Sequence, residues 1–187
     1  LAGKTNKSIV SLLNQQGAKA VGLSGKDANL ILACKMESPK GDLGFVGEVV
    51  KVNADFLNSL VSQSYIPVIC SVAIGHDGAS YNVNADHVAG HIAAAMGASK
   101  LIMLSDVEGL YRDFSDKTSL IHEMDTDEAH HLIVTGVADK GMIPKLEACI
   151  TALEGGVERA HLIDGRQPHS LLIEIFTNSG IGTMVRR

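Results

Sequence analysis

The chain has 187 residues, a formal net charge of −5 at neutral pH, and 45% hydrophobic against 20% charged residues. That length suffices for a well-buried globular domain, and the hydrophobic share is ordinary for one. The acidic balance, the 4% of aromatic residues and the lack of tryptophan argue against a general nucleic-acid binder. The apolar runs are far shorter than a membrane span, and from the first residues we expect neither a signal nor a transit peptide. Three widely spaced cysteines predict reduced thiols in a cytoplasmic protein.

Helical and strand-like patterns alternate along the chain. In chain order we expect a helix at 5–16, strands at 18–23, 30–36 and 44–52, a helix at 53–65, a strand at 66–74, a helix at 84–97, a strand at 100–104, helices at 125–135 and 143–153, a strand at 159–163, a helix at 169–177 and a strand at 182–185. Because most of these strands are apolar without alternation, they favour a parallel sheet. We therefore predict an α/β fold, a three-layer αβα sandwich with a mainly parallel central sheet.

The strongest local pattern is Tyr81–Asp86, between a strand and an alanine-rich helix. Asn84 suits the N-cap of that helix, and Asp86 suits its first turn, where a carboxylate stabilises the helix dipole. Capping does not explain Asn82, two positions earlier on the same side of an extended segment. Since α/β proteins bind ligands at the carboxyl ends of strands and at helix N-termini, the three polar side chains favour a ligand site over a cap alone.

A second pattern is Asp139–Lys145. Pro144 fits the first turn of a helix, and Lys145 falls in the same turn, where its charge opposes the helix dipole by roughly 0.3–1 kcal/mol. A local cost of this kind often marks function, and phosphate is the natural guest of a lysine beside backbone amides. A solvated surface lysine is the alternative interpretation.

In the third pattern, the apolar strand at 101–104 runs directly into Ser105, Asp106 and Val107. Polar residues at the carboxyl end of a parallel strand face the ligand crevice, although ordinary turn chemistry would also place them there. No metal-binding cluster is evident in the sequence. Together the three patterns predict a domain that binds a nucleotide or another phosphorylated small molecule.

The motifs Asn82–Asp86, Leu104–Val107 and Gly141–Lys145, in this order, resemble those of the acetylglutamate kinase group of the amino acid kinase family. The resemblance runs from Leu1 to Val185, and it includes Val21–Asp27, Gly44–Glu48 and Gly180–Thr183. It implies the carbamate kinase-like fold of that family. A weak composition shift near Ser80 suggests a division, with 1–80 as the remainder of the acceptor-binding part and 81–187 as the nucleotide-binding part of one continuous unit.

The resemblance implies transfer of the γ-phosphoryl group of ATP, carried with Mg²⁺, to the side-chain carboxylate of N-acetyl-L-glutamate in arginine biosynthesis. By the same resemblance, Lys145 would stabilise charge on the phosphates, and Asp86 would orient the catalytic lysines. Asn82 would bind the acceptor's α-carboxylate, with Asn84 supporting the same loop. The nucleotide pocket would be lined by Ser105, Asp106, Val107, Gly141 and Met142.

The C-terminal stretch at 169–183 resembles that of the arginine-sensitive members of the family. It implies an effector site for L-arginine at His169, Glu174, Gly180 and Gly182, with Glu174 pairing with the guanidinium group. A plain amphipathic terminal helix is the alternative. The family resemblance also implies a homo-oligomer, with neither nucleic acid nor membrane as a partner.

One part of the family pattern has no match: an N-terminal strand with a catalytic lysine, a glycine-rich loop and an acceptor-binding arginine. We therefore expect the chain to be the C-terminal two-thirds of the enzyme, which would leave this chain alone inactive. A non-catalytic fragment that binds nucleotide or arginine is one alternative. A sister kinase acting on carbamate, glutamate, aspartate or UMP is another.

Overall fold

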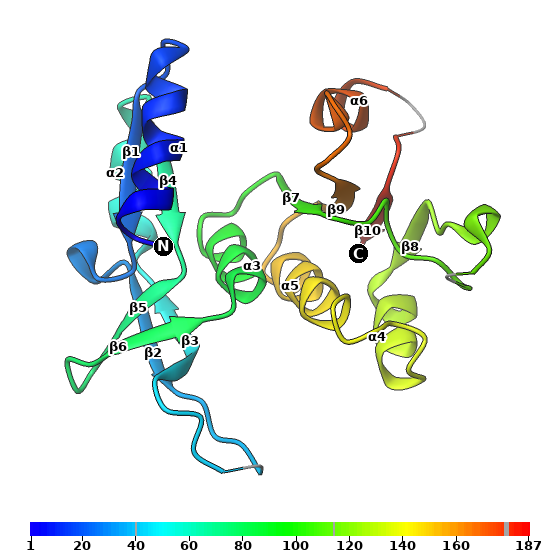
Figure 1. Cartoon of the computed structure of the whole chain (residues 1–187), viewed down its shortest axis with the longest axis horizontal. Helices are drawn as coiled ribbons and strands as arrows, with labels where there is room; N and C mark the ends of the chain where they lie inside the picture. Colours follow the sequence, from blue (N-terminus) through cyan, green and yellow to red (C-terminus); the bar gives the residue numbers. More distant parts are fainter. Residues whose placement is uncertain (40, 114, 178–179) are drawn as a thin grey trace. The chain divides into compact units, whose positions relative to one another are not determined.

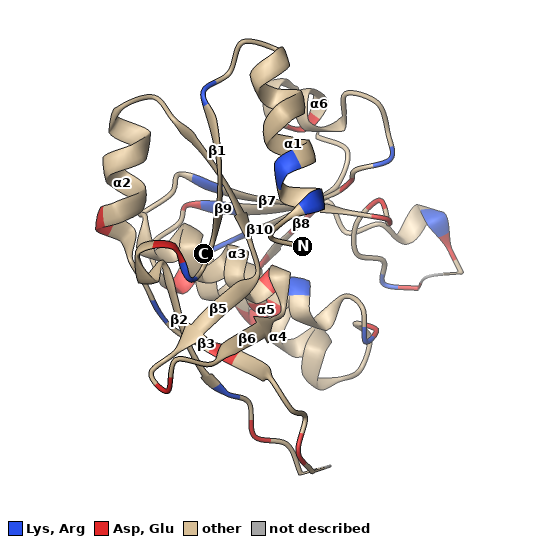
Figure 2. Cartoon of the chain, turned by 60° about the vertical axis from the view of Figure 1, so that its left-hand side comes forward, with Lys and Arg blue, Asp and Glu red and all other residues tan. Residues whose placement is uncertain are grey.

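The computed structural model describes residues 1–39, 41–113, 115–177 and 180–187. The chain folds as two compact units, Leu1–Met96 and Gly97–Arg187 (Figure 1). Lysine and arginine are interspersed with aspartate and glutamate along the chain, which agrees with its mildly acidic net charge (Figure 2). Among the described residues, no helix has the length and apolar content that crossing a membrane requires.

The described residues of the first unit form three helices, one 3₁₀ turn and six strands. They are α1 (Lys4–Gln15), β1 (Ala20–Ser24), η1 (Asp27–Asn29), β2 (Ile31–Lys35), β3 (Val46–Val52), α2 (Ala54–Ser62), β4 (Ile66–Cys70), β5 (Val72–Gly75), β6 (Ser80–Val83) and α3 (Ala85–Ala95). Strands β1 and β4 pair in parallel. Strands β2, β3, β6 and β5 close into a small barrel, in which β2–β3 and β5–β6 are antiparallel.

The apolar run at 66–74, expected as one strand, is two strands separated at Ser71. Before Ser71 the chain pairs with β1, and after it the chain pairs with β2 and β6 in the barrel. Gly25 lies against this crossing, and its amide donates to the Val72 carbonyl at 2.6 Å. A Cβ at Gly25 would lie 2.9 Å from the Ala73 Cα, so only glycine fits there. An unbroken hydrophobic pattern carries no sign of such a change of sheet, which explains the error.

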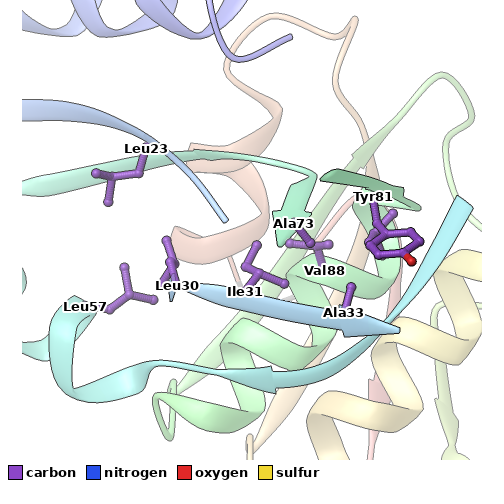
Figure 3. Packing of buried hydrophobic residues seen from close by; sticks show 9 residues of the cluster. Leu23, Leu30, Ile31, Ala33, Leu57, Ala73, Tyr81 and Val88 are labelled. Carbon is purple, nitrogen blue, oxygen red and sulfur yellow. The ribbon is translucent and has the colours of Figure 1, made fainter. Parts of the chain in front are cut away.

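The core of the first unit lies between strands and helices distant in sequence (Figure 3). Leu30 and Ile31 at the start of β2, Leu57 of α2 and Ala73 of β5 are completely buried. Burial of each large aliphatic side chain contributes about 1.5–3 kcal/mol, so this cluster joins α2 to the barrel. Val88 of α3 belongs to the same cluster and anchors the helix that follows Asn84.

In the second unit, the part of the chain that the structure describes forms three helices, one 3₁₀ turn and four strands. They are β7 (Lys100–Ser105), η2 (Lys117–Ser119), β8 (Glu123–Asp125), α4 (Thr126–Val134), α5 (Ile143–Glu154), β9 (Arg159–Asp164), α6 (Ser170–Phe176) and β10 (Thr183–Arg186). The sheet order is β7-β9-β10-β8, with β7–β9 and β8–β10 parallel and β9–β10 antiparallel. Helix α5 packs on this sheet through a buried face that includes Leu146, Cys149 and Leu153.

The predicted α/β class is confirmed, and all six expected helices form close to their predicted positions. The described strands are divided among three sheets with both parallel and antiparallel pairs. The sequence patterns did not predict β6, β8 or the two 3₁₀ turns, all of which are at most four residues long. The boundary between the compact units follows Met96. The functional division at residue 80 therefore stays a prediction, and β6 and α3 belong to the first unit.

Candidate active site

A cavity of about 580 Å³ opens in the second unit at the carboxyl end of β7. It brings together the six residues that the sequence assigned to the nucleotide and to phosphoryl transfer: Ser105, Asp106, Val107, Gly141, Met142 and Lys145. Asp139 and Lys140, which open the second sequence pattern, also line the cavity, and the sequence did not single out the remaining lining residues, Gly109, Leu110, Tyr111, Arg112 and Val137. Their positions directly beside the two motifs were the available signal.

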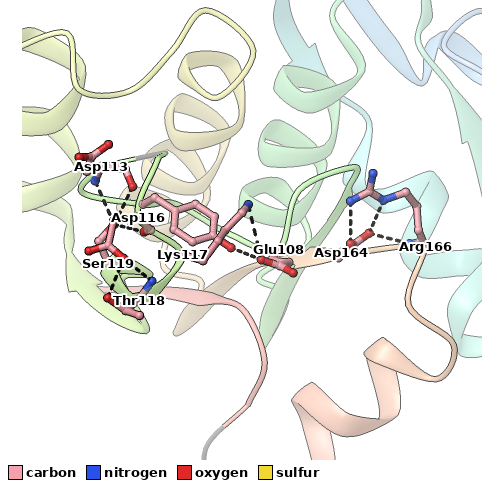
Figure 4. Close-up of polar contacts among 9 residues, drawn as sticks. Glu108, Asp113, Asp116, Lys117, Thr118, Ser119, Asp164 and Arg166 are labelled. Atoms are coloured by element: carbon pink, nitrogen blue, oxygen red, sulfur yellow. Dashed lines mark hydrogen bonds and ion pairs between the residues drawn. The ribbon is translucent and has the colours of Figure 1, made fainter.

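The strand ends at the cavity are fixed by sheet pairing. Ser105 is the partner of Asp164 across β7 and β9, and the Gly165 amide donates to the Ser105 carbonyl at 2.8 Å. Arg166 donates to both carboxylate oxygens of Asp164, with Nε at 3.0 Å and Nη2 at 2.9 Å (Figure 4). These hydrogen bonds hold the pKa of Asp164 below its usual value. This pairing compensates the charge of Arg166, which lies two residues beyond the strand.

The loop after β7 forms another wall of the cavity and has its own polar contacts (Figure 4). The Tyr111 hydroxyl donates to Glu108, and the Lys117 ammonium lies 4.5 Å from the Tyr111 ring centroid. The same ammonium is 3.9 Å from the Glu108 carboxylate. Burial, followed by the interaction with Glu108, raises the pKa of Tyr111 to about 12. Tyr111 is therefore a neutral hydrogen-bond donor at pH 7 and gives the cavity an aromatic wall.

We expected the backbone amides at the start of α5 to be available to a phosphate, but Asp139 already accepts their hydrogen bonds. Asp139 Oδ1 accepts the amides of Gly141 and Met142, both at 2.8 Å, and its carbonyl accepts the Ile143 amide at 3.0 Å. Anion binding here would thus rest on the side chains of Lys140 and Lys145 rather than on these amides. The Asp139 carboxylate also offsets part of the cost of placing Lys145 in the first turn.

In the first unit, the structure places Asn82, Asn84 and Asp86 around the start of α3. Asn84 Oδ1 accepts the amides of Asp86 at 2.8 Å and His87 at 3.3 Å, which confirms the predicted cap. Asn82 lies in β6 and pairs with neighbouring strands. Asn82 and Asn84 are exposed, and Val83 between them is buried, so the two amide side chains share one side of the segment. Their role toward an acceptor stays a prediction.

The C-terminal region gathers three of the four residues assigned to L-arginine. Glu174 is only 9% exposed, and its Oε2 accepts the amides of Ile181 at 2.7 Å and Gly182 at 3.3 Å. A Cβ at Gly180 would lie 2.6 Å from the same oxygen. His169 instead begins α6 with a positive φ of 63°, and residues 178 and 179 of this stretch lie outside the described residues.

Glu174 also has a buried partner that the sequence analysis missed. Its Oε1 lies 2.6 Å from Nδ1 of His161, a 7% exposed residue of β9. Burial would raise the pKa of Glu174, but the Ile181 amide, His161 and the Gly182 amide together hold it below its usual value. Three internal groups therefore already engage the Glu174 carboxylate, and its pairing with a guanidinium stays a prediction. A lone histidine in an otherwise apolar strand was the signal for this pair.

Comparisons with known proteins identify the family of this chain. Residues 1–164 match the model of the amino acid kinase family. The chain belongs to the amino acid kinase family. It is 53% identical over 196 residues to an acetylglutamate kinase of Pelotomaculum thermopropionicum, and 55% identical over 185 residues to one of Caldanaerobacter subterraneus. The matches cover 100% and 99% of this chain but 66% and 62% of those relatives, so the chain spans just under two thirds of their length.

Several solved structures share the fold of this chain at low sequence identity. N-acetylglutamate synthase from Neisseria gonorrhoeae, complexed with coenzyme A and N-acetyl-glutamate, matches 95% of this chain and 40% of its own, with a TM-score of 0.82 and 24% identity. The same enzyme complexed with coenzyme A and L-arginine matches 90% of this chain and 38% of its own, with a TM-score of 0.76 and 24% identity. Carbamate kinase from Giardia matches 100% and 69% of the two chains, with a TM-score of 0.68 and 14% identity.

Proposed function

We propose that this chain carries the nucleotide-binding part, and a portion of the acceptor-binding part, of an ATP-dependent acetylglutamate kinase. The product would be N-acetylglutamyl 5-phosphate, formed in arginine biosynthesis. The observation that carries the proposal is the meeting of Ser105–Val107 and Gly141–Lys145 at one cavity, in a chain more than half identical to named acetylglutamate kinases. The proposal also includes a cytoplasmic location for the protein and its assembly into a homo-oligomer.

The reaction brings two anions together, so its catalysis requires positioning and positive charge. As the bond from the γ-phosphorus to its bridging oxygen breaks and a bond to the acceptor carboxylate forms, negative charge spreads over the phosphoryl oxygens. Lys145 is the half-buried cation at the cavity that would stabilise this charge. Asp86 would orient cationic groups rather than act as a base, because a carboxylate acceptor has no proton to remove at pH 7.

Two asparagines of the first unit are assigned to the acceptor. Asn82 would donate its amide to the α-carboxylate of N-acetylglutamate, since its side chain is exposed beside the α3 start. Asn84 would support the same segment through its two backbone hydrogen bonds. These assignments predict that changes at Asn82 affect the acceptor more than the nucleotide.

Magnesium fits this cavity as an ion carried by the nucleotide. No group of three or more histidine, cysteine, aspartate and glutamate side chains in the described part of the chain forms a metal site. Asp106 and Asp139 are the carboxylates that line the cavity, and Asp139 is occupied by two backbone amides. Asp106 is therefore the better candidate to face a magnesium ion held mainly by phosphate oxygens. The ion would supply neutralising charge to those oxygens.

The same protein is proposed to respond to L-arginine through His169, Glu174, Gly180 and Gly182, with His161 as a further residue beside Glu174. The supporting observation is the buried Nε2 of His161, which has no partner among the described residues. Buried polar atoms of this kind are uncommon and often belong to a site. The arginine complex of the structurally similar synthase adds support at the level of the fold.

The decisive experiment is a coupled assay, on the enzyme of which this chain is proposed to be part, with MgATP and a panel of acceptors: N-acetyl-L-glutamate, carbamate, glutamate, aspartate and UMP. Turnover restricted to N-acetyl-L-glutamate supports the proposal. Turnover of another acceptor alone replaces it with a sister kinase. Nucleotide binding without turnover on any acceptor assigns this chain the role of a non-catalytic binding fragment.

A further inference from the structure

Thr183, the first residue of β10, has its hydroxyl group buried against the loop that walls the cavity. The side chain is 0% exposed. Its Oγ1 accepts the Leu110 amide at 2.8 Å and donates to the Ile121 carbonyl at 2.6 Å. The hydroxyl therefore satisfies two backbone groups at once, both of them far from Thr183 in sequence.

These two backbone groups close the base of one loop. The Ile121 amide donates to the Leu110 carbonyl at 2.8 Å, and Tyr111 and Leu120 form an antiparallel bridge just inside that pair. In a regular antiparallel pair, the Leu110 amide would donate directly to the Ile121 carbonyl. Here the Thr183 hydroxyl stands between these groups and relays the hydrogen bond. The base of the loop is thus joined through a side chain to the first residue of β10.

Close packing between Gly109 and Thr183 also indicates that the loop is fixed against β10. A Cβ at Gly109 would lie 2.5 Å from Thr183 Oγ1 and 3.1 Å from the Thr183 amide nitrogen. Such distances are too short for any side chain, so the loop approaches β10 as closely as glycine permits. The Thr183 hydroxyl and Gly109 together fix the distance between the loop and β10.

The wall in question is the one that faces the cavity. Gly109, Leu110 and Tyr111 all line it, and Thr183 lies behind them. We propose that Thr183 is a positioning residue, which holds this wall in place and so sets the affinity for the nucleotide. The inference rests on the proposed nucleotide site, since it assigns Thr183 a role behind that cavity.

The outer part of the loop keeps its shape through separate contacts. Asp113 accepts the amide of Ser115 at 2.9 Å, Asp116 accepts the amide of Thr118 at 2.8 Å, and the Ser119 hydroxyl donates to the Asp113 carbonyl at 2.8 Å (Figure 4). Loss of the Thr183 hydroxyl therefore releases the base of the loop while these turns persist. The expected result is a displaced cavity wall rather than an unfolded loop.

The test compares Thr183→Val, which has the same shape without the hydroxyl, with Thr183→Ser, which keeps it. MgATP binding is measured by titration calorimetry, and Tm is measured alongside. We expect the Kd for MgATP to rise about tenfold or more in Thr183→Val and to stay within about threefold of the parent in Thr183→Ser. Val157→Ala is the matched control, because Val157 is buried at the other end of the second unit's sheet, just before β9. It should lower Tm and leave the Kd unchanged.

Each result decides between defined alternatives. An unchanged Kd in a folded Thr183→Val variant overturns the role of Thr183 and leaves the nucleotide site intact. Absence of MgATP binding by the parent chain overturns the proposed function itself. If Thr183→Val does not fold, Thr183→Ala, which also removes the hydroxyl but is smaller, decides the question: a weakened Kd supports the positioning role, and a Kd equal to that of the parent overturns it.

Discussion

Helices α3 and α5 begin with the same hydrogen-bond pattern but with opposite charges. Asn84 accepts the amides two and three residues ahead of it, and Asp139 does the same before α5. At α3 the cap is a neutral amide, and the first turn carries the acidic Asp86. Before α5 the acceptor is the Asp139 carboxylate, which closes the turn that leads into the helix, and the first turn of α5 carries Lys145.

This contrast shows that capping geometry alone does not identify a binding site. Both helix starts satisfy their amides internally, which removes those amides as partners for a phosphate. What distinguishes α5 is that its Lys145 lines a cavity together with residues at the carboxyl end of β7. The charge and the cavity, rather than the helix terminus, therefore carry the functional assignment.

The largest effect is expected at Lys145. Lys145→Ala should lower kcat about 100-fold or more, equivalent to ~3 kcal/mol, because a preorganised charge at the transferring phosphoryl group is lost. Steady-state kinetics of the active enzyme with MgATP and N-acetyl-L-glutamate measures this. Lys100→Ala, an exposed lysine at the opposite end of β7, is the matched control and should be neutral. A kcat unchanged by Lys145→Ala would remove α5 from the catalytic assignment.

The two side-chain acceptors, Asn84 at α3 and Asp139 in the turn before α5, should contribute equally to stability but differ in their influence on binding. Asn84→Ala and Asp139→Ala should each lower the free energy of unfolding by about 1 kcal/mol. Asp139→Asn keeps a capping oxygen and removes a negative charge from the cavity, so MgATP should bind a few-fold more tightly. Urea unfolding and calorimetry give the two quantities. Weaker MgATP binding in Asp139→Asn would show that the carboxylate itself assists the nucleotide.

A smaller and more selective effect is expected at Asn82. Asn82→Ala should raise the KM for N-acetyl-L-glutamate by roughly fivefold, as loss of one hydrogen bond to a charged group implies, with little change in the KM for ATP. The matched control is Asn53→Ala, which removes a capping asparagine at α2 elsewhere in the first unit. Equal changes in both KM values would move Asn82 out of the acceptor pocket.

Acid titration of stability tests the buried carboxylate of the second unit, Glu174. The folded-state pKa of Glu174 lies below its usual value, so its stabilising contribution is complete above the unfolded pKa of about 4.5. That contribution is lost as the pH falls through the lower, folded-state pKa. Glu174→Gln should therefore unfold more easily than the parent at pH 7, with the difference shrinking as pH falls toward 3. Parallel unfolding curves at both pH values would contradict this account.

Much of the local structure was predictable because it depends on neighbours in sequence. Pro144 in the first turn of α5 and Asn84 at the start of α3 predicted both helix starts correctly. The short strands β6 and β8 were missed because four or fewer residues carry little periodicity. The break at Ser71 was missed because it depends on which sheet each half of an apolar run joins.

The sequence by itself determined the α/β class, the six helices and the three motifs that belong to the amino acid kinase family. Only the tertiary structure showed that Asp139 occupies the amides before α5, that His161 pairs with Glu174, and that Thr183 joins the cavity wall to β10. The reason is physical: these contacts link residues through space, and their energies depend on burial and orientation. Neighbours along the chain specify neither of these.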